Sequence, residues 1–174
     1  HGAHRINNSW LDAATDLGHT SFATGGVRTT FNIGNYYGGG GANELTSTWE
    51  HYYRGIRKCN MLITRIDNVP KPVDLAEEEY NRKKTYYISE ARFLRAFFYW
   101  EMFLRYGPVP IVTEVLDPDG DLLSGYTTRP SIQDFVVNFI MDELSKCEAG
   151  LLDQATVDAK KDQYAGQITQ PMAC

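Results

Sequence analysis

The stretch YYISEARFLRAFFYWEMFLRYGPVPI, residues 86–111, decides the fold of this chain. Up to Arg105 it contains neither Gly nor Pro, and good helix formers make up much of it. Gly107 and Pro108 then predict a sharp helix end, because glycine suits the position just past a helix and proline cannot continue the hydrogen-bond ladder. Residues 109–112 should be extended, since a residue before proline is pushed out of the α region.

Apolar side chains in this stretch recur at the spacing of one broad helical face. They are Tyr87, Ala91, Leu94, Phe98 and Met102, with Phe97 and Trp100 widening the face. A helix this aromatic has to pack against other helices. Arg95 lies between Leu94 and Ala96, so its aliphatic stem should cover apolar surface while its guanidinium reaches an acid or a helix end.

Two long segments show strong helical periodicity. Residues 43–67 form the first, with Thr46 or Ser47 as a plausible cap and Glu50 completing a capping box. The second covers residues 74–106 and contains the deciding stretch. Its length leaves a break near its middle, at the two adjacent lysines, as an open alternative.

The periodicity continues in the last third of the chain. Ser131 should cap a third helix whose apolar stripe extends from Ile132 to Leu151, and a fourth helix should open at Gly166. Together the helices should bury one aromatic layer. Its expected members are Trp49, Tyr53, Leu94, Phe98, Phe135 and Phe139.

The first part of the chain has a weaker pattern. Residues 7–17 could make a short helix, capped by Asn8 or Ser9. Glycine clusters between Gly18 and Gly41 predict loops with little regular structure.

Composition bounds the function classes. The 174 residues suit one domain or a piece of one. The net charge is −5 and there is no run of Lys or Arg, so nucleic acid and anionic membrane surfaces are not expected partners. The three cysteines form no CxxC pair, which argues against a zinc or redox site, and Cys59 and Cys147 should be buried thiols. We expect no cofactor.

The sequence contains no recognisable catalytic constellation. The four histidines form no HExxH motif, and no serine lies in a GxSxG context. Residues 117–121 place three carboxylates at alternate positions, but the rest of a calcium-binding EF-hand loop is missing, so we interpret them as a turn. We therefore expect a binding protein and not an enzyme.

Taken together, four sequence motifs resemble the signature of the SusD/RagB family. SEARFLRAFFYWEMFLRYGPVPIV resembles the family pattern EARFLRAxxYxxLxxxYGxVPL. The segment from Trp49 to Asn60 resembles the family's W…Y..I…N helix, and Arg129-Pro130-Ser131 followed by Asp142-Glu143-Leu144 resembles its R-x-S…DL helix. GQIT at residues 166–169 resembles GRIT, with Gln167 where Arg is usual.

This resemblance implies a mostly α fold of tetratricopeptide-like helical hairpins with long irregular loops. Residues 1–45 would form a loop-rich segment with a short helix, and residues 46–174 would form hairpins, the last one truncated. The chain would be the N-terminal portion of a single SusD-like domain, so one of its partners would be the remainder of its own polypeptide.

The resemblance also implies a function and a location. Family members are lipid-anchored proteins of the outer membrane at the cell surface. They bind an oligosaccharide or polysaccharide without enzymatic activity and deliver it to a TonB-dependent transporter of the SusC type. Three alternatives remain open: a peptide-binding uptake protein of the same family, a glycan-degrading enzyme, and a helical-repeat scaffold with no small ligand.

The loop before the first strong helix holds the candidate ligand-binding residues, Asn35, Tyr36, Tyr37 and Asn43. Aromatic faces can stack on the C–H surfaces of sugars, and amides can bind their hydroxyl groups. The resemblance places part of the family's glycan site in the corresponding region. The alternative is that Tyr36 and Tyr37 pack the loop onto the helices.

Overall fold

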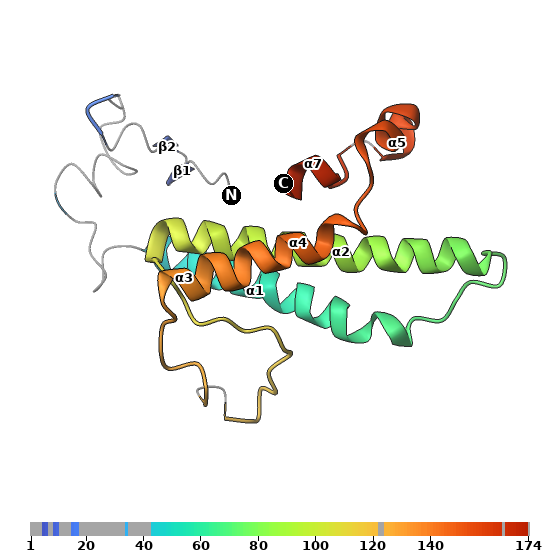
Figure 1. Ribbon diagram of the computed structural model, residues 1–174. Coiled ribbons are helices and arrows are strands. Elements are labelled where there is room, and N and C mark those ends of the chain that lie inside the picture. The colour runs from blue at the N-terminus through green and yellow to red at the C-terminus, as the bar shows by residue number, and fades with distance from the viewer. Residues whose placement is uncertain are drawn as a thin grey trace. The chain divides into compact units, whose positions relative to one another are not determined.

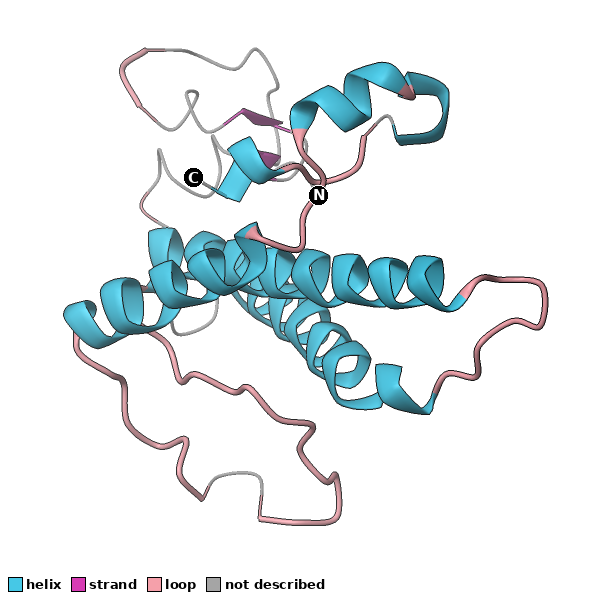
Figure 2. Ribbon diagram, turned by 45° about the vertical axis from the view of Figure 1, so that its right-hand side comes forward, coloured by secondary structure: helices cyan, strands magenta, loops and turns pink. Residues whose placement is uncertain are grey.

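A computed structural model describes residues 5–6, 9–10, 15–17, 34, 43–121, 124–164 and 166–173 (Figure 1). The chain divides into two compact units, residues 1–51 and 52–174, which are considered separately. The second unit is built from helices joined by loops, as Figure 2 shows. This mostly α fold is the one that the sequence predicts.

Helix α2, Glu77–Tyr106, is the longest element of the described chain and contains most of the deciding stretch. It is continuous through Lys83 and Lys84, where a break was an open alternative. Gly107 ends the helix as expected: its φ is 69°, and its backbone N–H donates to the carbonyl of Phe103 at 2.9 Å. A positive φ is cheap only for glycine, which explains this residue at the helix end.

Helix α1, Asn43–Arg65, precedes α2 and is followed by the short 3₁₀ helix η3, Ile66–Asn68. Because α1 begins at Asn43, the proposed caps Thr46 and Ser47 lie inside its first turns, and the capping-box prediction is wrong. Helical propensity at residues 43–45 is enough to extend the helix beyond a Ser or Thr that could have capped it.

The third predicted helix consists of α3, Ile132–Phe135, the π-helical segment η4, Val136–Met141, and α4, Asp142–Glu148. Ser131 caps it as predicted, since its hydroxyl accepts a hydrogen bond from the Asp134 N–H at 3.1 Å. The predicted stripe fails at its first member, because Ile132 is 62% exposed in the first turn.

Tyr99 lies at the centre of the aromatic layer of the second unit and is fully buried. Its ring meets those of Phe135 and Phe139 edge-on, with centroids 5.8 and 5.0 Å away. Phe135 is fully buried as predicted, whereas the other expected core residues are only half-buried. These are Trp49 in the first unit and Tyr53, Leu94, Phe98 and Phe139 in the second.

One margin of the α2 stripe faces outward. Tyr87, Phe97 and Trp100 are 47%, 43% and 40% exposed, so the predicted apolar face is too broad. Helical spacing identifies an apolar sector, but the number of neighbouring helices decides how much of that sector is covered.

The end of the chain contains three short helices: α5, Gln154–Ala159, α6, Lys161–Tyr164, and α7, Gln170–Ala173. The fourth helix therefore begins at Gln170, and not at Gly166, which has a φ of 81° outside any helix. Helices α5 and α6 were not predicted, because they are too short to show a periodic pattern.

In the first unit, β1, Arg5–Ile6, pairs antiparallel with β2, Ser9–Trp10. The predicted short helix over residues 7–17 is therefore wrong at Ser9 and Trp10. Asn and Ser are weak helix formers that favour turns, so the spaced apolar residues do not suffice for a helix here. Among the described residues, no helix is long and apolar enough to cross a membrane.

Candidate functional site

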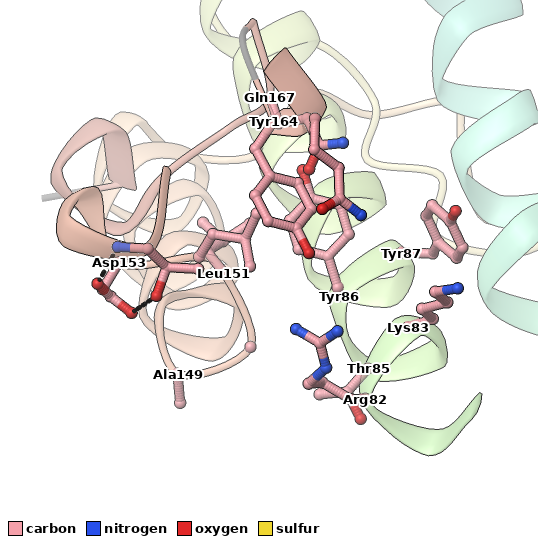
Figure 3. A pocket seen from close by; sticks show the side chains of 14 residues that line it. Arg82, Lys83, Thr85, Tyr86, Tyr87, Ala149, Leu151, Asp153, Tyr164 and Gln167 are labelled. Atoms are coloured by element: carbon pink, nitrogen blue, oxygen red, sulfur yellow. Dashed lines mark hydrogen bonds between the residues drawn. The ribbon is translucent and has the colours of Figure 1, made fainter. Parts of the chain in front are cut away.

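A cavity of about 680 Å³ opens in the second unit between the first half of α2 and the segment that follows α4 (Figure 3). One wall comes from a single helical stretch, because residues three and four apart share a helix face. Its residues are Arg82, Lys83, Thr85, Tyr86 and Tyr87.

The opposite wall comes from the chain between α4 and α7. Gly150 brings this wall close to α2, since a Cβ at this position would meet the Ser89 side chain, with Ser89 Cβ 3.1 Å away. The residues of this wall that matter for binding are polar or aromatic. They are Asp153, Thr156, Gln163, Tyr164 and Gln167.

Tyr86 anchors the cavity floor. It is 8% exposed and belongs to an apolar cluster with Cys147, Leu151 and Ala173. Its hydroxyl donates to Glu90 Oε1 at 3.2 Å, and burial together with this carboxylate raises the pKa of Tyr86. Because Tyr86 stays neutral and fixed, it offers a ring surface to a ligand and no charge.

The charged groups on the walls are Arg82, Lys83 and Asp153. Lys83 forms an ion pair with Glu79 one turn earlier, at 2.9 Å. Both carboxylate oxygens of Asp153 accept hydrogen bonds from Thr156, one from its N–H at 2.8 Å and one from its hydroxyl at 2.7 Å. These bonds lower the pKa of Asp153, so its negative charge is fixed on this wall at neutral pH.

A smaller hollow of about 250 Å³ adjoins the cavity at the turn between α1 and α2. Lys83 and Tyr87 line both spaces, so both hollows border this edge of α2. The smaller one is apolar, with Ile66, Val69 and Leu75 among its walls. The hydroxyl–carboxylate pair of Thr156 and Asp153 is the N-terminal cap of α5, so the arrangement suits binding.

The loop residues predicted from sequence are not tested by this geometry. Asn35, Tyr36 and Tyr37 lie outside the described residues, and Asn43 is known only as the first residue of α1. Sequence reasoning missed the cavity itself. A signal for it was the adjacent pair Tyr86-Tyr87, of which Tyr87 was assigned to the apolar face of the helix.

The acidic residues 117–121 form the expected turn. Asp117 accepts hydrogen bonds from the N–H of Asp119, through its carboxylate at 3.1 Å, and from the N–H of Gly120, through its carbonyl at 3.1 Å. Within the described part of the chain, no three His, Cys, Asp or Glu side chains come together as a metal site would require.

Three of the four motifs noted in the sequence meet in one buried polar network. Glu143 of α4 accepts from Arg92 and Arg95 of α2, and Arg95 also donates to Asn60 Oδ1 of α1 at 2.8 Å. The amide of Asn60 in turn donates to the carbonyls of Val112 and Glu114, both at 3.0 Å. The network thus ties three helices to the extended segment after α2, and it confirms the predicted acid partner for Arg95.

Residues 9–163 match the model of a family described as SusD-like, starch-binding and associating with the outer membrane. The chain belongs to the SusD-like family. The buried network connects three of the four family motifs, because each of the three supplies one side of the same set of hydrogen bonds. No curated protein sequence shows significant similarity to the chain.

Solved structures of SusD-like proteins are similar to this chain. A SusD-like protein from Bacteroides fragilis is 29% identical with a TM-score of 0.58, over 74% of this chain and 22% of that one. A SusD-like carbohydrate-binding protein from the same organism is 28% identical with a TM-score of 0.57, over 72% and 21%. The surface glycan-binding protein A of Bacteroides uniformis is 25% identical with a TM-score of 0.52, over 73% and 25%.

These SusD-like relatives are helical, tetratricopeptide-like proteins, and the predicted fold class is thereby confirmed. The family consists of binding proteins, which agrees with the expected absence of enzymatic activity at the level of the family. The chain spans a quarter or less of the length of these three solved relatives.

Proposed function

We propose that this protein captures an oligosaccharide at the cell surface, without enzymatic turnover, and passes it to a TonB-dependent transporter of the SusC type. The family match over residues 9–163 carries this proposal, because the family is starch-binding and associates with the outer membrane. A lipid anchor and the transporter as partner are part of the proposal.

The cavity beside α2 supports a saccharide as the ligand. Sugars present C–H faces that stack on aromatic rings and hydroxyl groups that bind amides, hydroxyls and charged side chains. The cavity supplies both kinds of group, with Tyr86 and Tyr164 as rings and Gln163 and Gln167 as amides. Its volume of about 680 Å³ is in the range of small-molecule sites.

The glycine-rich loop before α1 remains a second proposed contributor. Tyr36 and Tyr37 would stack on the sugar, and Asn35 and Asn43 would bind its hydroxyl groups. We further propose that residues 1–174 are part of one SusD-like domain, with residues 46–174 as its hairpins and the remainder of the polypeptide completing the site.

Titration of the complete natural protein with a panel of oligosaccharides tests the proposed function. Calorimetry should detect saturable binding of at least one sugar, and assays for newly released reducing ends should stay at background. Release of reducing ends would favour the glycan-degrading enzyme, and binding of peptides alone would favour the peptide-uptake alternative.

Two variants locate the site. Tyr164→Ala should weaken sugar binding by about tenfold, because an aromatic at the centre of a binding surface commonly contributes more than 1 kcal/mol. Tyr126→Ala is the control, since Tyr126 contacts Glu114 in the loop after α2 and does not line the cavity. Equal affinities of both variants and the wild type would place the sugar elsewhere.

A further inference from the structure

Arg82 has a distinctive position among the arginines of α2. In the described part of the chain, Arg92 and Arg95 bind Glu143 and Arg105 binds Glu101, whereas Arg82 makes no hydrogen bond or ion pair. Arg82 precedes Tyr86 by one helical turn. Figure 3 shows its guanidinium directed toward Tyr86, and Arg82 lines the cavity together with Tyr164.

Two of the acids near Arg82 are already engaged. Glu79 lies on the same helix and binds Lys83 at 2.9 Å, and its pKa is lowered mainly by that lysine, with a smaller contribution from Arg82. Asp153 lies on the opposite wall with both oxygens bonded to Thr156. Glu78 lies one turn before Arg82 on α2 and forms no hydrogen bond or ion pair with it in the described part of the chain. The guanidinium is therefore a charged donor that lines the cavity without a bonded carboxylate.

We propose that the cavity recognises an acidic saccharide, in which a carboxylate or sulfate group binds Arg82 while the sugar ring lies against Tyr164. A guanidinium is a planar fork of donors that matches the oxygen pairs of these anions. The negative charge of Asp153 disfavours a second anionic group at the opposite wall. The acidic sugar unit of the ligand therefore binds beside Arg82. This inference rests on the proposed function and adds the class of sugar to it.

Matched ligands test the inference on the complete natural protein. An oligogalacturonide and its fully methyl-esterified form share a backbone and differ in the charge of their carboxyl groups. A sulfated oligosaccharide and its desulfated form make a second pair, which differs only in sulfate. Calorimetry at low ionic strength should give at least about tenfold tighter binding for the acidic member of one pair, and the pair that responds identifies the anion. The preference should fall as salt is added.

Three variants assign the preference to Arg82. Arg82→Gln should abolish the preference, so that the acidic and neutral members bind with equal affinity. Arg82→Lys should retain part of it, because lysine keeps the charge but lacks the fork. Lys146→Gln is the control: it also removes one positive charge, from a surface pair with Asp142 outside the cavity. The melting temperature of Arg82→Gln should match the wild type, since no protein carboxylate loses its partner.

The outcomes separate the two proposals. Equal affinity for acidic and neutral members, or a preference that survives Arg82→Gln, overturns the inference and leaves the glycan-binding function in place. Loss of the preference in Lys146→Gln also overturns it, because a general surface charge would then be responsible. Failure of the natural protein to bind any saccharide overturns the proposed function and the inference together.

Discussion

Arg95 of α2 and Glu143 of α4 form a buried ion pair across 48 residues of sequence, with 2.5 Å between Nη2 and Oε2 and 3.0 Å between Nε and Oε2. Their side chains are 4% and 5% exposed, and the second carboxylate oxygen of Glu143 accepts from Arg92 at 2.9 Å. One carboxylate thus binds two guanidinium groups, that of Arg95 away from water and that of Arg92 at a partly exposed position. Loss of either partner leaves an uncompensated charge in the interior.

Glu143→Gln should lower the free energy of unfolding by about 3–5 kcal/mol, because Arg95 would remain buried without a countercharge. Denaturation with urea measures the change. Asp142→Asn is the matched control. Asp142 lies next to Glu143 and pairs with Lys146 at the surface, so this variant should lower the free energy of unfolding by less than about 1 kcal/mol. Similar decreases in the free energy of unfolding for the two variants would show that the buried pair stabilises the protein no more than the surface pair does.

Tyr99→Phe should cost about 1–3 kcal/mol, because it removes one hydroxyl that serves two backbone groups. This hydroxyl accepts from the Val112 N–H at 2.7 Å and donates to the Val112 carbonyl at 3.2 Å, so it fastens the extended segment to the core. Hydrogen exchange should also rise at Val112. Tyr126→Phe is the comparison, because the Tyr126 hydroxyl bonds to Glu114 near the surface. An equally large decrease in the free energy of unfolding for Tyr126→Phe would contradict the special role of the Tyr99 hydroxyl.

Gly55→Ala should destabilise the protein by about 1–3 kcal/mol despite the better helix propensity of alanine. A Cβ at this position would come within 2.7 Å of Phe98 Cε2, which is closer than packed carbons tolerate. Phe98→Leu in the same chain should recover part of the loss by making room. A double-variant cycle in which the two changes simply add would rule out the steric explanation.

Cys59 and Cys147 should resist thiol reagents at pH 8 in the folded protein. Burial raises the pKa of each thiol to about 11, so almost none is present as the reactive thiolate. In a Cys174→Ser variant, reaction with an aromatic disulfide reagent should therefore be slow until denaturant is added. Fast reaction of either cysteine in the native state would show that it is accessible.

The same two pKa values predict a loss of stability in alkali. The folded-state pKa of each thiol lies above its ordinary value of 9.0. The contribution of the two neutral, buried thiols to stability is therefore fully present below pH 9 and is lost as the pH rises toward 11. Replacing both cysteines by alanine should reduce the slope of stability against pH in that interval.

Local rules were enough to predict several features of the helices. Gly107 ends α2 and Ser131 caps α3 because each choice depends on the backbone within a few residues. The partner of Arg95 was predicted as a kind of group, an acid, but not as Glu143. The short helix predicted over residues 7–17 is wrong at Ser9 and Trp10, because weak helix propensity could not compete with strand pairing there.

The sequence by itself determined the helical class, the long helix through residues 86–106 and the family. Apolar periodicity, helix-terminating residues and family motifs each depend only on short stretches of sequence. Only the tertiary structure determined the presence and the position of the cavity. Its walls, residues 82–87 and 149–167, adjoin only because Gly150 lets the chain after α4 approach Ser89, and because Tyr86 packs with Cys147 and Leu151. Contacts between segments this far apart depend on packing, which no local pattern records.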